Sequence, residues 1–361
     1  MRAVQHSVQK TGDIAPLLLA HYDRHARDLP WRKLPGQGLP DPYHVWLSEI
    51  MLQQTTVAAV APYFRKFTER WPDVVALAAA DEADIMAAWA GLGYYARARN
   101  LVKCARVVVA EYEGNFPNTE AALLELPGVG AYTAAAIAAI AFGQRAVVVD
   151  ANIERVVSRL FAIGTPLPAG KTEIRAATDA ITPDARSGDF AQAMMDLGAG
   201  ICSVRSPSCL VCPLSGHCAA GQTGTAEGYP VKPAKKAKPH RTGTAYWIEQ
   251  EGRVWLVQRA ANGMLGGMRA LPDDGWSARS DGSGELPFAA DWQILPLTVG
   301  HVFTHFSLSL EVAVTSLRAD ANPPCDGEYW PVKSLDKAGL PTLFNKAAKA
   351  VIASDRKFTG E

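Results

Sequence analysis

The stretch LPGVGAYTAA, residues 126–135, decides how the first half of this chain folds. Its proline and two glycines interrupt a region of strong helix formers, and the alanine-rich run AAAIAAIAF follows at residues 134–142. Glycine adopts positive φ angles and lets another backbone approach closely, so Gly128 and Gly130 permit a tight turn. The pattern therefore predicts a helix, a tight turn and a second, buried helix.

A turn of this kind leaves the first amide N–H groups of the second helix pointing outward. Those donors and the helix dipole bind an anion. A DNA phosphate fits this description, and such a contact carries no sequence information. An ordinary connection between two helices is the alternative, and the residues PGVG alone do not separate the two interpretations.

The hydrophobic period divides the rest of the chain. From residue 13 to 220, apolar positions recur at helical spacing. The helical stretches predicted from this pattern are 44–57, 74–90, 97–112, 120–125, 131–142 and 151–162. We therefore expect an all-α first domain over residues 1–220.

The character of the sequence changes after residue 220. Residues 221–242 are rich in Gly, Pro and Lys, which predicts an exposed basic linker, either simply solvated or in contact with phosphate. Beyond it the period falls to two, and Glu251-Gly252 separates two strand-like runs as a hairpin turn would. With more strands within 297–317 and a closing helix at 340–353, residues 243–361 are predicted to form an α+β domain.

The composition is that of a globular protein with more than one domain. The chain has 361 residues, 48% hydrophobic and 20% charged, and its formal net charge is +0. A surface that binds nucleic acid would therefore be a local basic patch. The N-terminus lacks the apolar core of a signal peptide, and no apolar run reaches the length of a membrane span. We expect a cytoplasmic monomer without membrane partners, associated with the nucleoid if the chain is bacterial.

Four of the six cysteines lie close together, at Cys202, Cys209, Cys212 and Cys218. Clustering in a chain of this kind indicates a metal site rather than disulfides. Four thiolates hold either a [4Fe–4S] cluster or a zinc ion. The single C-x-x-C pair favours the cluster, because zinc ribbons usually carry two such pairs.

Two carboxylates stand in contrasting surroundings. Glu49 would share a helix face with Val45, Trp46 and Leu52, where an acid is either paired for structural reasons or raised in pKa by desolvation. Asp150 follows three valines and precedes a helix, so it is either a plain N-cap or an acid that the helix dipole keeps ionised. A neutral acid and an ionised one together form the arrangement that cleaves glycosidic bonds.

The hairpin and the aspartate together resemble the helix-hairpin-helix DNA glycosylase superfamily, in which a Gly/Pro-rich loop and a catalytic aspartate follow the hairpin. The resemblance covers residues 20–220 and implies the helix-hairpin-helix glycosylase fold for the first domain. The cysteine spacing resembles the loop of endonuclease III and MutY-type members. It implies a structural [4Fe–4S] cluster in residues 202–218, with Arg205 near the DNA backbone.

The resemblance also implies a reaction. Glu49 would donate a proton to the departing base, while Asp150 would stabilise C1′ of the sugar or attack it. Endonuclease III-like members carry a lysine two residues after the hairpin's last glycine, and its amine forms a Schiff base that permits strand cleavage. This chain has Tyr132 there, which implies a monofunctional enzyme that leaves an abasic site. The alternative is that Tyr132 is simply an aromatic residue that packs on the face of a helix.

Further stretches resemble the MutY-type adenine DNA glycosylases in particular. They are LPWR at 29–32, WLSEIMLQQT at 46–55, GLGYYARARNL at 91–101 and VDANIERV at 149–156. The resemblance implies double-stranded DNA with adenine opposite 8-oxoguanine or guanine as the substrate, and adenine flipped into a pocket. The residues implied to contact the DNA or the base are Trp31, Arg32, Leu52, Gln54, Tyr94, Gly128, Gly130, Asn152 and Gln192.

The second domain resembles the Nudix fold but has no counterpart of that family's acidic R-E-x-x-E-E helix, so phosphohydrolase activity is not expected. In MutY-type enzymes this domain reads the 8-oxoguanine. Their phenylalanine–serine–histidine element matches Phe303, Thr304 and His305, where threonine keeps the hydroxyl donor and adds a methyl group. The alternative interpretation is that these three residues simply form part of a buried strand.

Three functions are therefore to be separated. The first is the monofunctional adenine glycosylase. The second is a pyrimidine glycosylase and lyase of the endonuclease III type, against which the missing lysine and the extra domain count. The third is an iron–sulfur DNA-binding module without catalysis.

Overall fold

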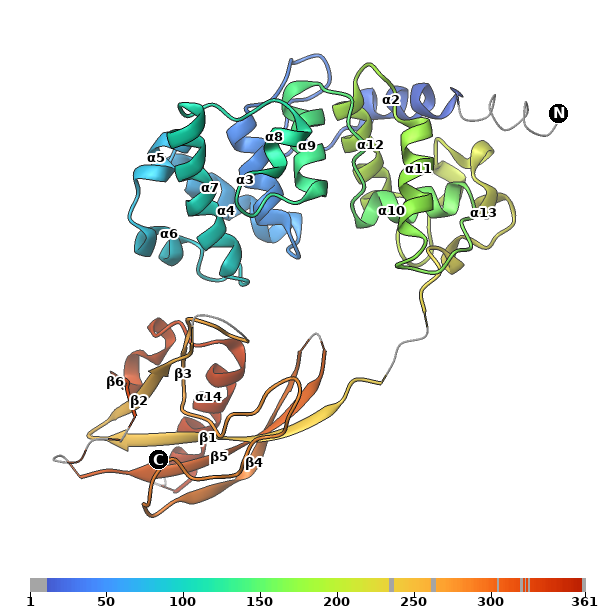
Figure 1. Ribbon diagram of the computed structural model, residues 1–361. Coiled ribbons are helices and arrows are strands. Elements are labelled where there is room, and N and C mark those ends of the chain that lie inside the picture. The colour runs from blue at the N-terminus through green and yellow to red at the C-terminus, as the bar shows by residue number, and fades with distance from the viewer. Residues whose placement is uncertain are drawn as a thin grey trace. The chain divides into compact units, whose positions relative to one another are not determined.

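The computed structural model describes residues 12–233, 237–260, 264–303, 305–318, 321, 323 and 325–358. The chain forms two compact units, over residues 1–234 and 235–361, which are described separately (Figure 1). Among the described residues the first unit contains helices and no strand, and the second is built on a sheet. The expected fold class, all-α followed by α+β, is confirmed.

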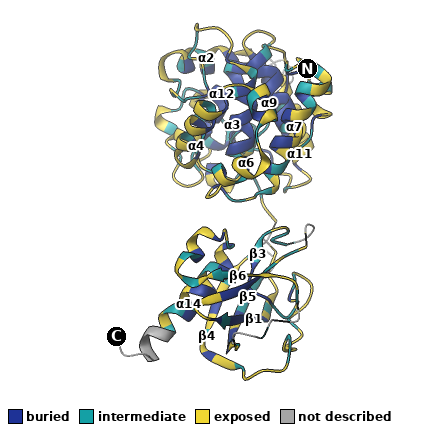
Figure 2. Cartoon of the chain, turned by 90° about the vertical axis from the view of Figure 1, so that its left-hand side faces the viewer, coloured by how far each residue is buried: buried dark blue, intermediate teal, exposed yellow. Residues whose placement is uncertain are grey.

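The first unit is organised around one buried helix. Its helices are α2 (Ile14–His25), α3 (Pro42–Leu52), α4 (Val57–Arg70), α5 (Val74–Ala79), α6 (Glu82–Ala88), α7 (Ala96–Tyr112), α8 (Glu120–Leu124), α9 (Ala131–Phe142), α10 (Ala151–Leu160), α11 (Lys171–Ile181) and α12 (Ser187–Gly200). Every residue of α9 from 133 to 141 is buried, and buried residues gather inside this unit (Figure 2). α9 packs against α3, α8 and α12. The neighbours approach closely because α9 is rich in alanine; a Cβ at Gly188 of α12 would collide with the backbone of Ala139.

The two glycines of the hairpin between α8 and α9 have different roles. Gly128 has a φ of +78°, and a Cβ there would lie 2.8 Å from the Cβ of Asn100, so both the backbone angle and the available space exclude other residues. Gly130 is the N-cap of α9 with a φ of −95°, which any residue adopts. A Cβ at Gly130 would meet nothing within 4 Å, so a ligand has room to approach the N-terminus of α9.

Two stretches expected as single helices are interrupted. The expected helix 44–57 covers α3, the loop after it and only the first residue of α4, and the expected helix 74–90 covers both α5 and α6. Thr56 and Asp81 start the second helix of each pair, since their side chains accept hydrogen bonds from backbone N–H groups of the first turn at 3.4 and 2.8 Å. The apolar period continues across both breaks because all four helices bury a face in one core.

After α12 the chain forms the cysteine loop, residues 202–218, with the 3₁₀ turns η1 (Cys209–Val211) and η2 (Ser215–His217). The helix α13 (Ala219–Gln222) and the 3₁₀ turn η3 (Ala226–Gly228) follow, so part of the segment expected as exposed linker is folded. Ala226 is buried, and the N–H of Leu167 donates to the carbonyl of Val231 at 2.9 Å. Contacts of this kind, to residues distant in the sequence, do not show in a Gly- and Pro-rich composition.

The second unit is a sheet with one long helix. Its elements are β1 (His240–Gln250), β2 (Arg253–Gln258), β3 (Arg269–Ala270), β4 (Gln293–Val302), β5 (Ser307–Ser316), β6 (Glu328–Pro331), the 3₁₀ segment η4 (Val332–Lys337) and α14 (Thr342–Phe358). The strand order is β3-β2-β1-β5-β4, with β6 paired to β2. β1 and β5 run parallel, with His240 opposite Ser307 and Glu249 opposite Ser316. The other pairs are antiparallel.

Local signals in the sequence account for much of this unit. The β1–β2 hairpin turns at Glu251 and Gly252, whose φ angles of +49° and +72° are those of a two-residue turn. α14 packs on the sheet (Figure 1), and its Phe344 joins Trp247 of β1 and Leu310 of β5 in the core. None of the described helices combines the length and the apolar character needed to span a bilayer.

Candidate active site

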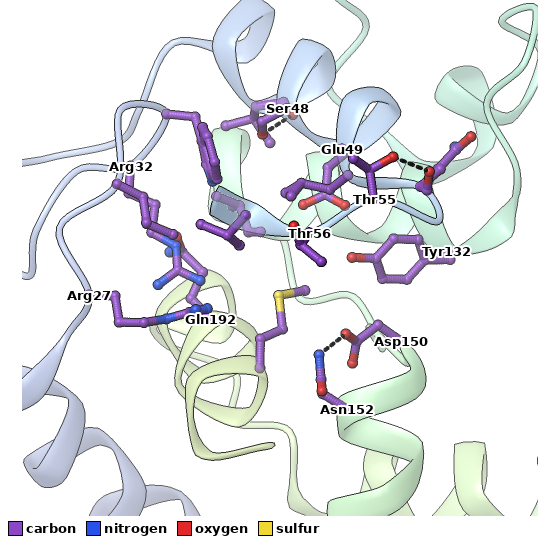
Figure 3. Close-up of a pocket in the computed structure, with 18 of the residues that line it drawn as sticks. Arg27, Arg32, Ser48, Glu49, Thr55, Thr56, Tyr132, Asp150, Asn152 and Gln192 are labelled. Carbon is purple, nitrogen blue, oxygen red and sulfur yellow. Dashed lines mark hydrogen bonds between the residues drawn. The ribbon is translucent and has the colours of Figure 1, made fainter. Parts of the chain in front are cut away.

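A cavity of about 760 Å³ opens in the first unit where α3, α9, α10 and α12 meet. Among the residues predicted from the sequence, those that line it are Trp31, Arg32, Glu49, Leu52, Gln54, Tyr132, Asp150, Asn152 and Gln192. Figure 3 shows that the labelled acids, amides and arginines among them reach the cavity from different helices and loops. Distant stretches of the sequence thus contribute to one site.

Glu49 lies on the buried face of α3, with 7% of its surface exposed. Burial disfavours its charged form and raises its pKa to about 7; interaction with the Tyr132 hydroxyl opposes the shift, and the charge of Asp150 adds to it. Much of Glu49 is therefore protonated at neutral pH. In this state the carboxyl group is a proton donor.

Asp150 is the N-cap of α10. Its Oδ1 accepts from the backbone N–H of Ile153 at 2.6 Å, and its Oδ2 accepts from the side-chain amide of Asn152 at 2.8 Å. These bonds favour the ionised carboxylate, as the sequence led us to expect, yet burial outweighs them and the pKa of Asp150 is raised. When the two carboxyl groups hold one proton between them, that proton resides mainly on Glu49. Two N–H donors and a helix N-terminus favour the charged form of Asp150.

Tyr132 lies between the two carboxyl groups at the start of α9 (Figure 3). Burial, together with the charges of Glu49 and Asp150, raises the pKa of its phenol well above the ordinary value. The phenol therefore stays neutral and offers an O–H donor to a carboxylate. The described residues that line the cavity include no lysine, so they provide no amine nucleophile.

Asp196 binds two arginines of the cavity wall, Arg27 and Arg32. Arg27 Nε donates to Asp196 Oδ1 at 2.6 Å, and Arg32 Nη1 donates to the two Asp196 oxygens at 2.9 and 2.8 Å. Gln192, which also lines the cavity, is buried four residues before Asp196 on α12. Arg27 and Asp196 were not predicted, although residues four apart on a helix share a face and would have placed Asp196 beside Gln192. Besides Arg27, the lining residues that were not predicted include Ser48, Gln53, Thr55, Thr56 and Met195.

Asn152 and Arg155 connect Asp150 to the cysteine loop. Arg155 Nη2 donates to Asn152 Oδ1 at 2.9 Å and to the carbonyl of Gly198 at 2.6 Å, and its Nε donates to the carbonyl of Cys202 at 2.8 Å. A Cβ at Gly198 would lie 2.6 Å from the Cβ of Asn152, so only glycine lets α12 come this close to α10. The orientation of Asp150 therefore depends on residues at the start of the cysteine loop.

The four cysteines of the cysteine loop line a second cavity, of about 200 Å³. The buried guanidinium of Arg159 donates to the carbonyl of Ser203 at 2.6 Å and to Cys202 Sγ at 3.3 Å. In the part of the chain that the structure describes, no three His, Cys, Asp or Glu side chains come close enough to share a single metal ion. Four thiols around a space of this size suit a group larger than one ion.

Tyr94 and the hairpin glycines lie outside the large cavity. Tyr94 is 58% exposed in the loop before α7. Its φ is +49° and that of Gln54 is +58°, so both residues adopt the left-handed conformation that residues other than glycine rarely take.

The tip of the β4–β5 hairpin carries the element predicted in the second unit. The N–H of Phe303 donates to the carbonyl of Phe306 at 2.8 Å, and the two rings stack with centroids 4.6 Å apart. His305 is exposed, while Thr304 lies outside the described residues. Phe303 and His305 therefore lie outside the strands β4 and β5, and neither belongs to a buried strand.

Comparison with known proteins gives a match in each unit. The model of the HhH-GPD superfamily base excision DNA repair proteins matches residues 47–181, and the NUDIX domain model matches residues 243–350. The adenine DNA glycosylase of Homo sapiens is 34% identical over 356 residues, which cover 82% of this chain and 65% of the human protein. This chain thus spans just under two thirds of that relative.

Two further similarities cover nearly the whole of the protein compared. The adenine DNA glycosylase of Buchnera aphidicola subsp. Schizaphis graminum is 35% identical over 338 residues, which cover 91% of this chain and 96% of that protein. The solved structure of a thermostable thymine-DNA glycosylase aligns with a TM-score of 0.54 and 32% identity, over 60% of this chain and 98% of that one.

Proposed function

This chain belongs to the adenine DNA glycosylase family, and we propose that it hydrolyses the N-glycosidic bond of adenine opposite 8-oxoguanine or guanine in double-stranded DNA. The observation that carries the proposal is the placing of Glu49, Tyr132 and Asp150 around one cavity. The reaction needs an acid and a group that stabilises positive charge, and these residues supply both. We propose that the protein acts as a monomer.

The two acids have different roles in breaking the N-glycosidic bond. A purine leaves readily once a ring nitrogen is protonated, and Glu49, with a pKa of about 7, is the donor. As the bond to the base breaks, the sugar gains oxocarbenium character, which Asp150 stabilises or captures by bonding to C1′. Water then adds to C1′ and its proton is taken up by a carboxylate, which restores the acid.

Tyr132 determines how the reaction ends. Endonuclease III-like enzymes have a lysine at the corresponding position, and its amine forms a Schiff base with the sugar. A neutral phenol cannot form that bond. The product is therefore an unbroken strand with an abasic site.

The N-terminus of α9 holds the DNA backbone in this proposal. Gly130 leaves open space in front of the helix, and the amides of its first turn point outward with the positive end of the helix dipole. A phosphate beside this turn would bring the sugar on its strand close to Tyr132 and Asp150, because the same helix carries Tyr132 in its first turn. The contact fixes register without reading sequence.

The second unit reads the base opposite adenine. Its support is the end of the β4–β5 hairpin, where the rings of Phe303 and Phe306 stack and His305 is exposed. Phe303, Thr304 and His305 offer an aromatic face, a hydroxyl and a ring nitrogen, which suit the extra polar atoms of an oxidised guanine. We place the catalytic unit in residues 1–220 and the lesion-reading unit in residues 243–361, joined by the segment 221–242.

The cysteine loop holds a [4Fe–4S] cluster in this proposal, bound by Cys202, Cys209, Cys212 and Cys218. An all-thiolate set around a cavity of about 200 Å³ fits such a group, which would fix the loop that also carries the acceptor for Arg155. Iron and acid-labile sulfide in equal amounts, about four of each per chain, are expected in the purified protein. About one zinc per chain without sulfide would contradict the cluster.

The proposed activity is tested with a duplex containing one adenine opposite 8-oxoguanine, under single-turnover conditions and with or without a hot-alkali quench. Strand breaks are expected only after alkali, because an abasic site survives a neutral quench. Breaks without alkali would indicate a lyase of the endonuclease III type. The absence of breaks under both quenches would leave a DNA-binding module. Equal rates opposite 8-oxoguanine and guanine would contradict lesion reading by the second unit.

A further inference from the structure

Arg97, in the first turn of α7, joins two loops, of which the first lines the large cavity. One loop, residues 53–56, links α3 to α4, and the other, residues 91–94, precedes α7. The Arg97 guanidinium donates five hydrogen bonds of 3.0 to 3.3 Å; the acceptors are the carbonyls of Ile50, Met51, Leu92 and Gly93 and the hydroxyl of Thr55. A single side chain therefore binds both loops and the end of α3.

The hydrogen bonds from Arg97 to α3 pair backbone carbonyls at the C-terminus of that helix. The last four carbonyls of a helix have no partner within it, and Arg97 caps two of them at the C-terminus of the helix that carries Glu49. The planar guanidinium presents several donors in fixed directions and so reaches both loops at once. A lysine ammonium is a single point on a flexible stem and cannot span the same set of acceptors.

Each loop holds one exposed residue in a strained conformation. Gln54 and Tyr94 both have left-handed φ angles, which cost free energy and persist only where the surroundings hold them. Gln54 lines the mouth of the cavity, and the Tyr94 ring centroid lies 5.5 Å from the Arg97 guanidinium. Arg97 binds Thr55, next to Gln54, and Gly93, next to Tyr94, and so helps to hold both loops in place.

We propose that Arg97 is a positioning residue that joins the two loops into one rigid unit, so that Gln54 and Tyr94 enter the duplex together as adenine leaves the base stack. The inference rests on the proposed function, which supplies the duplex. Extruding a base loses stacking, and side chains already fixed in place can fill the space without losing further freedom on binding. Loops that moved independently would lose that freedom in every encounter with DNA.

The test compares Arg97→Lys with Arg106→Lys, its control on the same helix. Arg106 is exposed, and its nearest acidic partner is Glu82 at 4.0 Å. A duplex with 2-aminopurine, a fluorescent adenine analogue, opposite 8-oxoguanine reports extrusion of the base. Arg97→Lys is expected to reduce the fluorescence gain and to lower the single-turnover rate on adenine at least about tenfold, with the Kd for DNA changed less than about threefold. Arg106→Lys should match the wild type in all three.

A second substrate separates positioning from a general loss of structure. Adenine opposite an abasic site unstacks more easily, so the rate defect of Arg97→Lys should shrink to less than about threefold there. A defect of equal size on both substrates, or no defect on either, overturns the proposal.

Thr55→Val keeps the test decisive even if Arg97→Lys does not fold. It removes the hydroxyl that accepts from Arg97 at 3.3 Å and donates to the carbonyl of Gln53 at 3.3 Å, and it keeps the four bonds from Arg97 to backbone carbonyls. The rate defect should therefore again be larger opposite 8-oxoguanine than opposite an abasic site, but smaller than for Arg97→Lys. A uniform effect of Thr55→Val on both substrates would also count against the proposal. A wild-type protein that fails to cleave adenine opposite 8-oxoguanine would refute the proposed function itself, which is a separate result.

Discussion

Glu49→Gln is expected to lower the single-turnover rate of adenine release by about 10³-fold at neutral pH. Glutamine has nearly the volume of glutamic acid but no proton to transfer, so the cavity keeps its shape and loses its acid. The rate is measured with protein in excess over a duplex containing adenine opposite 8-oxoguanine, so that product release does not contribute. Glu69→Gln on the exposed surface of α4 is the control and should react at the wild-type rate.

The pH dependence should identify Glu49 as the group responsible. Because its pKa is about 7, the protonated fraction falls roughly tenfold for each pH unit above that value, and the wild-type rate should fall with it. The residual rate of Glu49→Gln should lack this alkaline limb. A wild-type rate that stays constant well above pH 7 would show that Glu49 is not the proton donor.

The same substitution should have the opposite effect on stability at high pH. The folded-state pKa of Glu49 is raised from 4.5 to about 7, so between these values the folded state binds a proton more tightly than the unfolded state. The stability present below pH 4.5 is lost as pH rises through 7, and the loss is roughly 3 kcal/mol. Glutamine does not ionise, so Glu49→Gln should gain about that much relative to the wild type between pH 4.5 and pH 8 in chemical denaturation. If the free energy of unfolding changed with pH in the same way for both proteins, the raised pKa of Glu49 would be contradicted.

The fold was predictable wherever a local signal determines it. The bounds of α9 agree with the predicted 131–142, because the glycine turn before it and Gly143 after it both interrupt the helix. The β1–β2 hairpin was predicted for a similar reason, since its turn residues carry the signal. The breaks at Thr56 and Asp81 were missed, because threonine and aspartate act as caps only when the backbone before them leaves the helix, and apolar periodicity does not show that.

The site was predictable in part, because the stretches that contain its acids resemble those of a known family. The sequence pointed to Glu49, Tyr132 and Asp150 from short stretches around each of them. Asp196 depends instead on contacts across the fold: it binds Arg27, 169 positions away. Burial is a property of the whole fold as well, so the N-cap position of Asp150 indicated an ionised acid while its depth in the structure raises its pKa.

Asp150→Asn is expected to lower the single-turnover rate by about 10²- to 10³-fold while leaving α10 in place. Asparagine is as good an N-cap as aspartate, so the bond from the backbone N–H of Ile153, 2.6 Å in the wild type, can be kept. The negative charge that, in the proposed function, stabilises the sugar cation is lost. Asp73→Asn is the matched control: Asp73 caps α5, accepts from the N–H of Ala76 at 2.7 Å, and lies outside the residues that line the cavity.

The comparison separates the two roles that the sequence left open for Asp150. If Asp150 is a plain N-cap, Asp150→Asn, like Asp73→Asn, should react within about tenfold of the wild-type rate. If Asp150 stabilises the sugar cation, the rate should fall only on substitution at position 150.

The pH profile of the rate adds an independent criterion. Because burial raises the pKa of Asp150, the wild-type rate should decline on the acid side as this carboxylate is protonated, and Asp150→Asn should lack that limb. If Glu49→Gln removes the alkaline limb and Asp150→Asn the acid limb, one residue gives the proton and the other must stay charged.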